Sequence, residues 1–73
     1  MSVVTHTTRI VKPIPFVDAW GHHNAIPVGP CVVEELGGER VGVFWGLAGE
    51  ESALLAVDAA EVAESSGQLV LLD

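Results

Sequence analysis

The stretch CVVEELGGERVGVFWGL, residues 31–47, predicts a β-hairpin and decides the fold class. Valines and aromatic residues, which favour strands, fill most of the apolar positions in its two arms. Gly37 and Gly38 separate the arms, and glycines can take the positive φ angles of a tight hairpin turn. In the second arm, large apolar residues alternate with arginine and glycine. The stretch therefore predicts a protein built mostly of β-strands.

The two faces of the second arm, residues 39–47, differ in character. Valines and Trp45 share one face, which we expect to lie in the core. The opposite face carries two glycines, which let a strand bend or another backbone approach, as at the corner of a small barrel. Phe44 stands on that second face as a large apolar residue. We therefore expect Phe44 to contact a partner.

The segment over residues 50–64 fits two interpretations. Its alanines, leucines and glutamates favour one continuous helix. Alternation over residues 52–57 instead favours a strand, and the pair Asp58 and Glu61 resembles a capping box that begins a helical turn over residues 59–63. We prefer the strand followed by a helical turn, with the single helix as the alternative.

The two ends of the chain also predict extended structure. Residues 2–12 are rich in β-branched side chains, but neither face is apolar throughout, which suits an edge strand or an arm. Pro13 and Pro15 remove two backbone donors, so residues 12–16, KPIPF, are expected to be a polyproline-like connector. Residues 68–73, QLVLLD, predict a last strand that is apolar on both faces and needs cover from the core and from a neighbouring subunit.

In order, these elements are a strand, a proline connector, a loop, a hairpin, a strand, a helical turn and a strand. Over residues 27–73 this pattern resembles a small five-stranded barrel of SH3-like type, with one short helical turn before the last strand. We expect a single domain, in which residues 1–16 are the N-terminal strand or arm with its connector and residues 17–73 are the barrel. The resemblance implies a fold but no particular activity, because small barrels serve binding, scaffolding and sometimes catalysis.

The composition points to association with a second chain. Hydrophobic residues make up 49% of the 73 residues, and the mean hydropathy is +0.46. A chain this short has little interior, and with Cys31 as its single cysteine no internal disulfide can stabilise it. Apolar patches left on a surface usually mark interfaces. We therefore expect a homo-oligomer or a complex with another protein.

The charge of the chain excludes some partners. Ten acidic residues against three lysines and arginines give a formal charge of −7. Such a chain is repelled by phosphate backbones and anionic lipid surfaces, so we expect neither nucleic acid nor a membrane as a partner. No stretch has the pattern of a secretory signal or the length of a membrane span. A lone cysteine is typical of a reducing compartment, so we expect a cytoplasmic protein.

The stretch DAWGHHNAIP, residues 18–27, holds the densest group of chemically active side chains. His22 and His23 are adjacent and would point in opposite directions on a strand, and their spacing to other ligand-type residues matches no zinc pattern. We therefore expect neither a metal nor another cofactor. Trp20 is expected either to fold over the core as a lid or to serve as a contact hot spot for a partner or ligand.

Three hypotheses for function follow, each from a different class. The leading one is a non-enzymatic small β-barrel that acts through protein–protein contacts, as a homo-oligomer, through Phe44 and the two terminal strands. The alternative is a small-molecule-binding barrel or enzyme with a pocket built around Trp20, His22, His23 and Trp45. The third is an acidic inhibitor or decoy of a basic protein surface. Because no catalytic set of residues stands out, an enzyme is the less favoured class, and the sequence names no substrate or partner.

Overall fold

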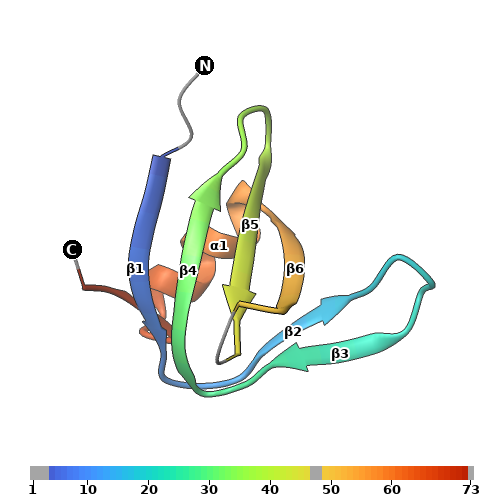
Figure 1. Cartoon of the computed structure of the whole chain (residues 1–73), viewed down its shortest axis with the longest axis horizontal. Helices are drawn as coiled ribbons and strands as arrows, with labels where there is room; N and C mark the ends of the chain where they lie inside the picture. The colour runs from blue at the N-terminus through green and yellow to red at the C-terminus, as the bar shows by residue number, and fades with distance from the viewer. Residues whose placement is uncertain (1–3, 47–48, 73) are drawn as a thin grey trace.

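The computed structural model describes residues 4–46 and 49–72 (Figure 1). Within these ranges the chain forms seven β-strands and one α-helix. They are β1 (Val4–Ile10), β2 (Ile14–Val17), β3 (His23–Ile26), β4 (Gly29–Glu35), β5 (Arg40–Trp45), β6 (Glu51–Ala56), α1 (Val57–Ser65) and β7 (Leu69–Leu71).

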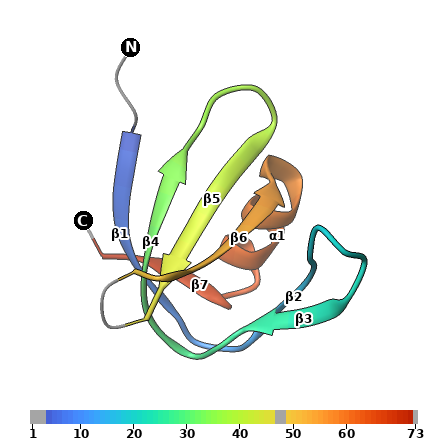
Figure 2. The same ribbon diagram turned by 45° about the vertical axis from the view of Figure 1, so that its right-hand side comes forward.

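Five of the strands form one antiparallel sheet in the order β6-β5-β4-β1-β7, and β2 pairs with β3 in a separate hairpin. Helix α1 lies behind this sheet, and the β2–β3 hairpin projects from one end of it (Figure 1, Figure 2). The mostly β class and a helix before the last strand are therefore confirmed. The predicted five-stranded SH3-like barrel is not confirmed. The sheet is open, because β6 and β7 lie at its two ends and do not pair with each other in the described ranges.

The central β4–β5 hairpin follows directly from its sequence. Gly37 and Gly38 have φ angles of 84° and 63°, a region in which a Cβ atom would be strained. This turn sets the register, in which Val33 lies opposite Val43. Both valines are buried, so the face that the alternation predicted as apolar does line the core.

The core lies between one face of the sheet, helix α1 and the base of the β2–β3 hairpin. Because side chains alternate along a strand, each strand contributes about every second residue to this core. Thr8 is fully buried among them, and its hydroxyl donates to the Cys31 carbonyl at 3.2 Å and lies 2.7 Å from the Cys31 sulfur. These contacts satisfy the hydroxyl, which burial removes from water. The buried apolar residues are Ile10, Ile14, Ile26, Cys31, Val33, Val41, Val43, Ala53, Leu55, Ala63 and Leu69.

Strand β1 is not the edge strand or free arm that the sequence predicted. It lies inside the sheet and pairs with both β4 and β7. Thr8 and Ile10 face the core and are fully buried, whereas Arg9 between them is exposed. The strand has a polar pattern because a threonine occupies a core position, and its hydroxyl partner, Cys31, is 23 residues further along the chain.

Residues 12–16 were predicted as a polyproline-like connector and residues 18–30 as a loop, but residues 14–26 contain the β2–β3 hairpin and β4 begins at Gly29. Ile14 lies opposite Ile26 at its base, and both side chains are buried in the core. This pair anchors the hairpin to the sheet. Each of the two short strands has a single buried residue, which is too little to produce a recognisable strand pattern in the sequence.

The phase of the hydrogen bonds explains how a proline fits into β2. The Asp18 amide donates to the His22 carbonyl at 2.9 Å, and bonded pairs recur at every second residue of an antiparallel ladder. Pro15, opposite Ala25, therefore lies at a position whose backbone points away from β3. A proline at such a position removes no ladder hydrogen bond, so the strand tolerates it.

The segment between residues 50 and 64 contains a strand followed by a helix, as preferred above. Buried and exposed residues alternate along β6. Helix α1 runs for nine residues and begins at Val57, so it is longer than the helical turn predicted over residues 59–63. The Val57 amide donates to the Glu39 carbonyl at 2.9 Å, and the N-cap position makes no side-chain cap bond. The predicted capping box therefore does not begin this helix.

The last strand, β7, is buried at one residue only. Leu69 is buried, whereas Val70 and Leu71 are partly exposed. Val70 lies opposite Arg9 on β1, on the face away from the core. The second cover that the sequence predicted for this strand stays a prediction.

Candidate binding groove

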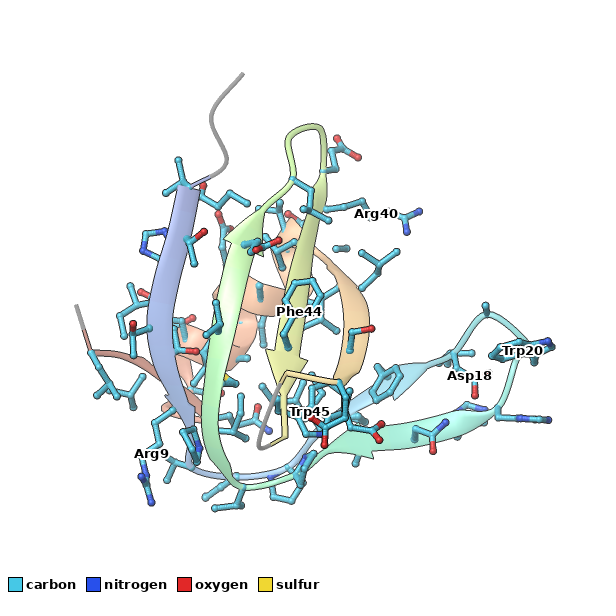
Figure 3. All side chains as sticks on the ribbon, in the orientation of Figure 1. Arg9, Asp18, Trp20, Arg40, Phe44 and Trp45 are labelled. Atoms are coloured by element: carbon cyan, nitrogen blue, oxygen red, sulfur yellow. The ribbon has the colours of Figure 1, made fainter. Side chains whose placement is uncertain are left out.

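A groove lies between the β2–β3 hairpin and strands β5 and β6, with most of its sheet side on the face that points away from the core. It encloses about 550 Å³, which is within the usual range of ligand sites. Figure 3 shows Trp20 at the tip of the hairpin and Phe44 on the sheet. The lining residues are Phe16, Val17, Asp18, Ala19, Trp20, Arg40, Phe44, Ser52, Ala53 and Leu54.

The sheet side of the groove is an apolar floor with one cation. Arg40, Gly42 and Phe44 alternate with the core valines of β5 and share the outer face. Leu54, opposite Gly42, is 57% exposed. A Cβ atom at Gly42 would lie 3.0 Å from the Phe44 ring, so the glycine leaves the space in which this ring rests. The close approach that the sequence suggested at this glycine is thus made by an aromatic side chain.

The hairpin side of the groove is held in shape by Asp18. One carboxylate oxygen accepts hydrogen bonds from the amides of Trp20 and His22, each at 2.9 Å. The other accepts from the Asn24 side chain at 3.0 Å. This turn presents the indole of Trp20 with 82% of the residue exposed, so Trp20 is not a lid on the core.

Trp45, the second tryptophan, supports the groove from the core side. Its ring meets that of Phe16 edge to face, with centroids 6.2 Å apart and an interplanar angle of 71°. Both rings pack against the buried core cluster. Because Phe16 belongs to β2 and Trp45 to β5, this aromatic pair fixes the angle between the hairpin and the sheet.

The structure brings together only part of the site that the sequence predicted. Trp20 and Phe44 line the same groove, whereas Trp45 packs against the core cluster and is not in the lining of the groove. His22 and His23 are exposed on the hairpin and also lie outside the lining. The histidines therefore do not meet the two tryptophans in one concavity.

Of the lining residues, only Trp20 and Phe44 were among the predicted site residues, and Arg40 and Leu54 are the most informative of those that sequence reasoning missed. The signal for Arg40 was present, because the alternation along β5 places it on the same face as Phe44. Leu54 could not be assigned in this way. Its position beside Gly42 depends on the register between β5 and β6, which the alternation of a single strand does not reveal.

Arg40 differs from its surroundings in charge. It is exposed, and none of the described residues forms an ion pair with it. The chain has only three lysines and arginines and a net charge of −7. An exposed guanidinium at the end of an apolar floor provides hydrogen-bond donors suited to a carboxylate.

The candidate metal ligands and nucleophiles do not converge. Within residues 4–46 and 49–72, no group of three or more histidine, cysteine or acidic side chains could hold a metal ion. His6 bonds Glu35 at 2.8 Å, and His22 Nδ1 lies 3.6 Å from Asp18. Cys31 is buried on the core face of β4.

Cys31 is expected to resist alkylation while the chain is folded. Burial raises the pKa of its thiol, and the hydrogen bond with Thr8 lowers it by less. Iodoacetamide at mildly alkaline pH should therefore label the folded chain slowly and the urea-unfolded chain rapidly, as followed by mass spectrometry. Because the unfolded thiol loses its proton at lower pH than the folded one, the free energy of unfolding should also fall as the pH rises past the ordinary thiol pKa. Equal labelling rates in the two states would contradict this assignment.

No family model, curated protein or solved structure matches this chain.

The one helix in the described residues, α1, is too short to cross a membrane.

Proposed function

We propose that this chain is a non-catalytic protein-binding module whose groove receives part of another protein. The main support is that Trp20 is 82% exposed and lies beside an apolar floor that includes Phe44 and Leu54. Tryptophans in such positions are the commonest energetic hot spots of protein interfaces. Exposed apolar surface on a small chain also indicates a site of contact with another molecule.

The arrangement of the reactive side chains favours binding over catalysis. His22 and His23 point from the hairpin outside the groove, and Cys31 is buried on the opposite face of the sheet. A nucleophile and a general base need to lie within hydrogen-bond reach of each other. The groove instead is lined mainly by aromatic and aliphatic side chains, together with Arg40, Ser52 and Asp18, whose carboxylate is taken up by hydrogen bonds within the hairpin turn. Aromatic residues and arginine are enriched at the centres of protein interfaces.

The order of elements supports an SH3-like plan for this module. A first strand, a projecting hairpin, the meander β4–β5–β6, a helix and a short last strand follow one another along the chain. In this proposal the groove lies between the hairpin and the meander. The plan itself specifies no partner.

Peptide selection tests the proposed function. A phage-displayed random-peptide library would be selected against the wild-type chain, and the selected peptides measured by fluorescence anisotropy. We expect Trp20→Ala to weaken their binding about thirtyfold, the usual cost of a hot spot of about 2 kcal/mol.

Val62→Ala is the matched control for that experiment. Val62 is an exposed apolar residue on α1, outside the groove, so its truncation should leave peptide affinity within about twofold of wild type. Failure to select any binder, or binders equally indifferent to both substitutions, would contradict the proposal. Self-association of the wild-type chain that Trp20→Ala abolishes, measured by light scattering, would instead make a second copy the partner.

A further inference from the structure

Strand β6 has a free edge that opens on the groove. It is the outermost strand at one side of the sheet, and in the described part of the chain no strand pairs with its outer side. Ser52, Ala53 and Leu54 of this strand line the groove. In Figure 1 and Figure 2 the β2–β3 hairpin diverges from β6 and leaves the outer side of this strand uncovered by another strand.

The hydrogen-bond phase shows which backbone groups this edge presents. The Val57 amide bonds the Glu39 carbonyl, so this pair and every second pair before it are bonded pairs of the ladder. Leu55 and Ala53 therefore direct their backbone groups towards β5. The amides and carbonyls of Ser52 and Leu54 and the amide of Ala56 point the other way, towards the free edge. The Ala56 carbonyl is not presented there, because Ala56 is the N-cap residue of α1 and its carbonyl accepts the first hydrogen bond of the helix.

Beyond Glu51 at its start, the edge of β6 lacks the features that protect edge strands from pairing. Such strands usually carry a proline, a bulge or a charged side chain. From Ser52 to Ala56, β6 has none of these and pairs with β5 without interruption. The outer edge of β2, on the other side of the groove, contains Pro15 and so lacks a donor. A strand that enters the groove can therefore join β6.

A charge marks one end of this edge. Arg40 lies opposite Ala56, and Phe44 lies opposite Ser52. The cation and the aromatic ring are thus four residues apart on one strand face, about 13 Å at about 3.3 Å per residue. Figure 3 shows the Arg40 side chain extending from β5 beyond the edge of the sheet, on the side of the Trp20 tip.

We infer that the occupant of the groove is an extended segment of a partner protein that adds to β6 as a further strand and places a carboxylate on Arg40. This inference rests on the proposed function. The segment's backbone bonds the amides and carbonyls of Ser52 and Leu54 and the amide of Ala56, and one of its apolar side chains packs between Trp20 and Phe44. The acidic side chain follows at a distance of about four residues on the same face, which matches the spacing of Arg40 and Phe44.

The overall charge makes this contact specific. A net charge of −7 repels carboxylates over most of the surface, so Arg40 is a local exception within the groove. The pairing fixes the register of the added strand, because a shift by one residue would turn the acidic side chain to the opposite face.

A charge reversal tests the carboxylate contact. Peptides selected on the wild-type chain would be measured against Arg40→Glu, each as the acidic form and as a form with lysine in place of the acidic residue. We expect Arg40→Glu to weaken the acidic peptide about tenfold or more and to restore binding with the lysine peptide. Arg9→Glu is the matched control, because Arg9 is an exposed arginine outside the groove (Figure 3). It should change the affinity by no more than about twofold.

Amide hydrogen exchange tests the strand addition. In the free chain the outward amides of Ser52 and Leu54 should exchange rapidly, while those of Ala53 and Leu55 are protected by β5. Saturating peptide should slow exchange at Ser52 and Leu54 and leave the other two unchanged. N-methylation of alternate peptide residues should abolish binding in one phase and have little effect in the other, because only every second residue of an added strand bonds its neighbour.

The outcomes separate this inference from the proposed function. Absence of any selected peptide would contradict the proposed function. Peptides that need Trp20 but bind Arg40→Glu as well as wild type, or that leave the Ser52 and Leu54 amides unprotected, would leave the proposed function standing and overturn the inference. Protection of these two amides by self-association alone, without peptide, would overturn it too, since the occupant would be a second copy.

Discussion

Replacing Ile26 with alanine is expected to lower the free energy of unfolding by about 2–5 kcal/mol. Ile26 is fully buried and lies opposite Ile14 at the base of the β2–β3 hairpin. Its truncation removes apolar contacts and leaves a cavity where the hairpin meets the sheet. Because small domains have only about 5–15 kcal/mol of stability in total, much of the chain should unfold at moderate temperature. Urea denaturation followed by circular dichroism would measure the change.

Val17→Ala is the control for the Ile26 prediction. Val17 belongs to the same hairpin but is more than half exposed, so its truncation should change the free energy of unfolding by less than about 0.5 kcal/mol. If both variants unfolded at the urea concentration of the wild-type chain, the hairpin base would not be part of the cooperative core.

Trp45→Ala is expected to lower the free energy of unfolding by about 3 kcal/mol. The Trp45 ring packs against the core and meets the Phe16 ring edge to face, a contact that contributes about 0.5–1.5 kcal/mol beyond the area it buries. Loss of this ring also frees the hairpin to change its angle to the sheet. The effect should be read from urea denaturation by circular dichroism.

Trp20→Ala is the counterpart to Trp45→Ala. Trp20 is 82% exposed, so its loss should change the free energy of unfolding by less than about 0.5 kcal/mol while it removes most of the peptide binding. The two tryptophans thus have separate roles, one in stability and one in contact. A stability loss of equal size in both variants would contradict this division.

The division of roles follows from the construction of the sheet. Residues on the inner face of β5 pack into the core, and residues on the outer face form the floor of the groove. Substitutions on the floor are therefore expected to change the proposed binding with little effect on the fold. Gly42 is the exception, because a side chain there would displace Phe44.

Much of the central sheet was predictable because its signals are local. The glycine pair at residues 37 and 38, the alternation along β5 and the alternation along β6 each involve neighbouring residues only. The prediction of a strand before a helix between residues 50 and 64 was confirmed for the same reason. Local patterns of this kind hold when one face of a strand is buried and the other is exposed.

The remaining parts of the fold depended on contacts between distant residues. From the sequence alone, Thr8 is expected on the surface. In the structure it is buried, because the Cys31 carbonyl and thiol in the neighbouring strand bond its hydroxyl. From the sequence alone, Pro15 is expected to end a strand. In the structure it lies at a position of β2 whose backbone makes no hydrogen bond with β3, so the strand tolerates it. In both cases the position of the residue depends on a neighbouring strand, and residues adjacent in the sequence do not reveal it.

The candidate groove shows the same limit. Trp20 and Phe44 could be proposed from their residue types, and Arg40 from its place beside Phe44 in the alternation. His22 and His23 were chemically attractive, but the turn built on Asp18 holds them outside the groove. Leu54 and the free edge of β6 required the register and order of the strands.

The amino-acid sequence was therefore sufficient for the β class, the central hairpin and the strand before the helix, because these depend on spacing between near neighbours. The three-dimensional structure decided the interior position of β1, the hairpin at residues 14–26 and the position of Arg40 at the end of an open strand edge. Those features depend on register and on burial against residues far away in the chain, and both exist only when the whole core is assembled.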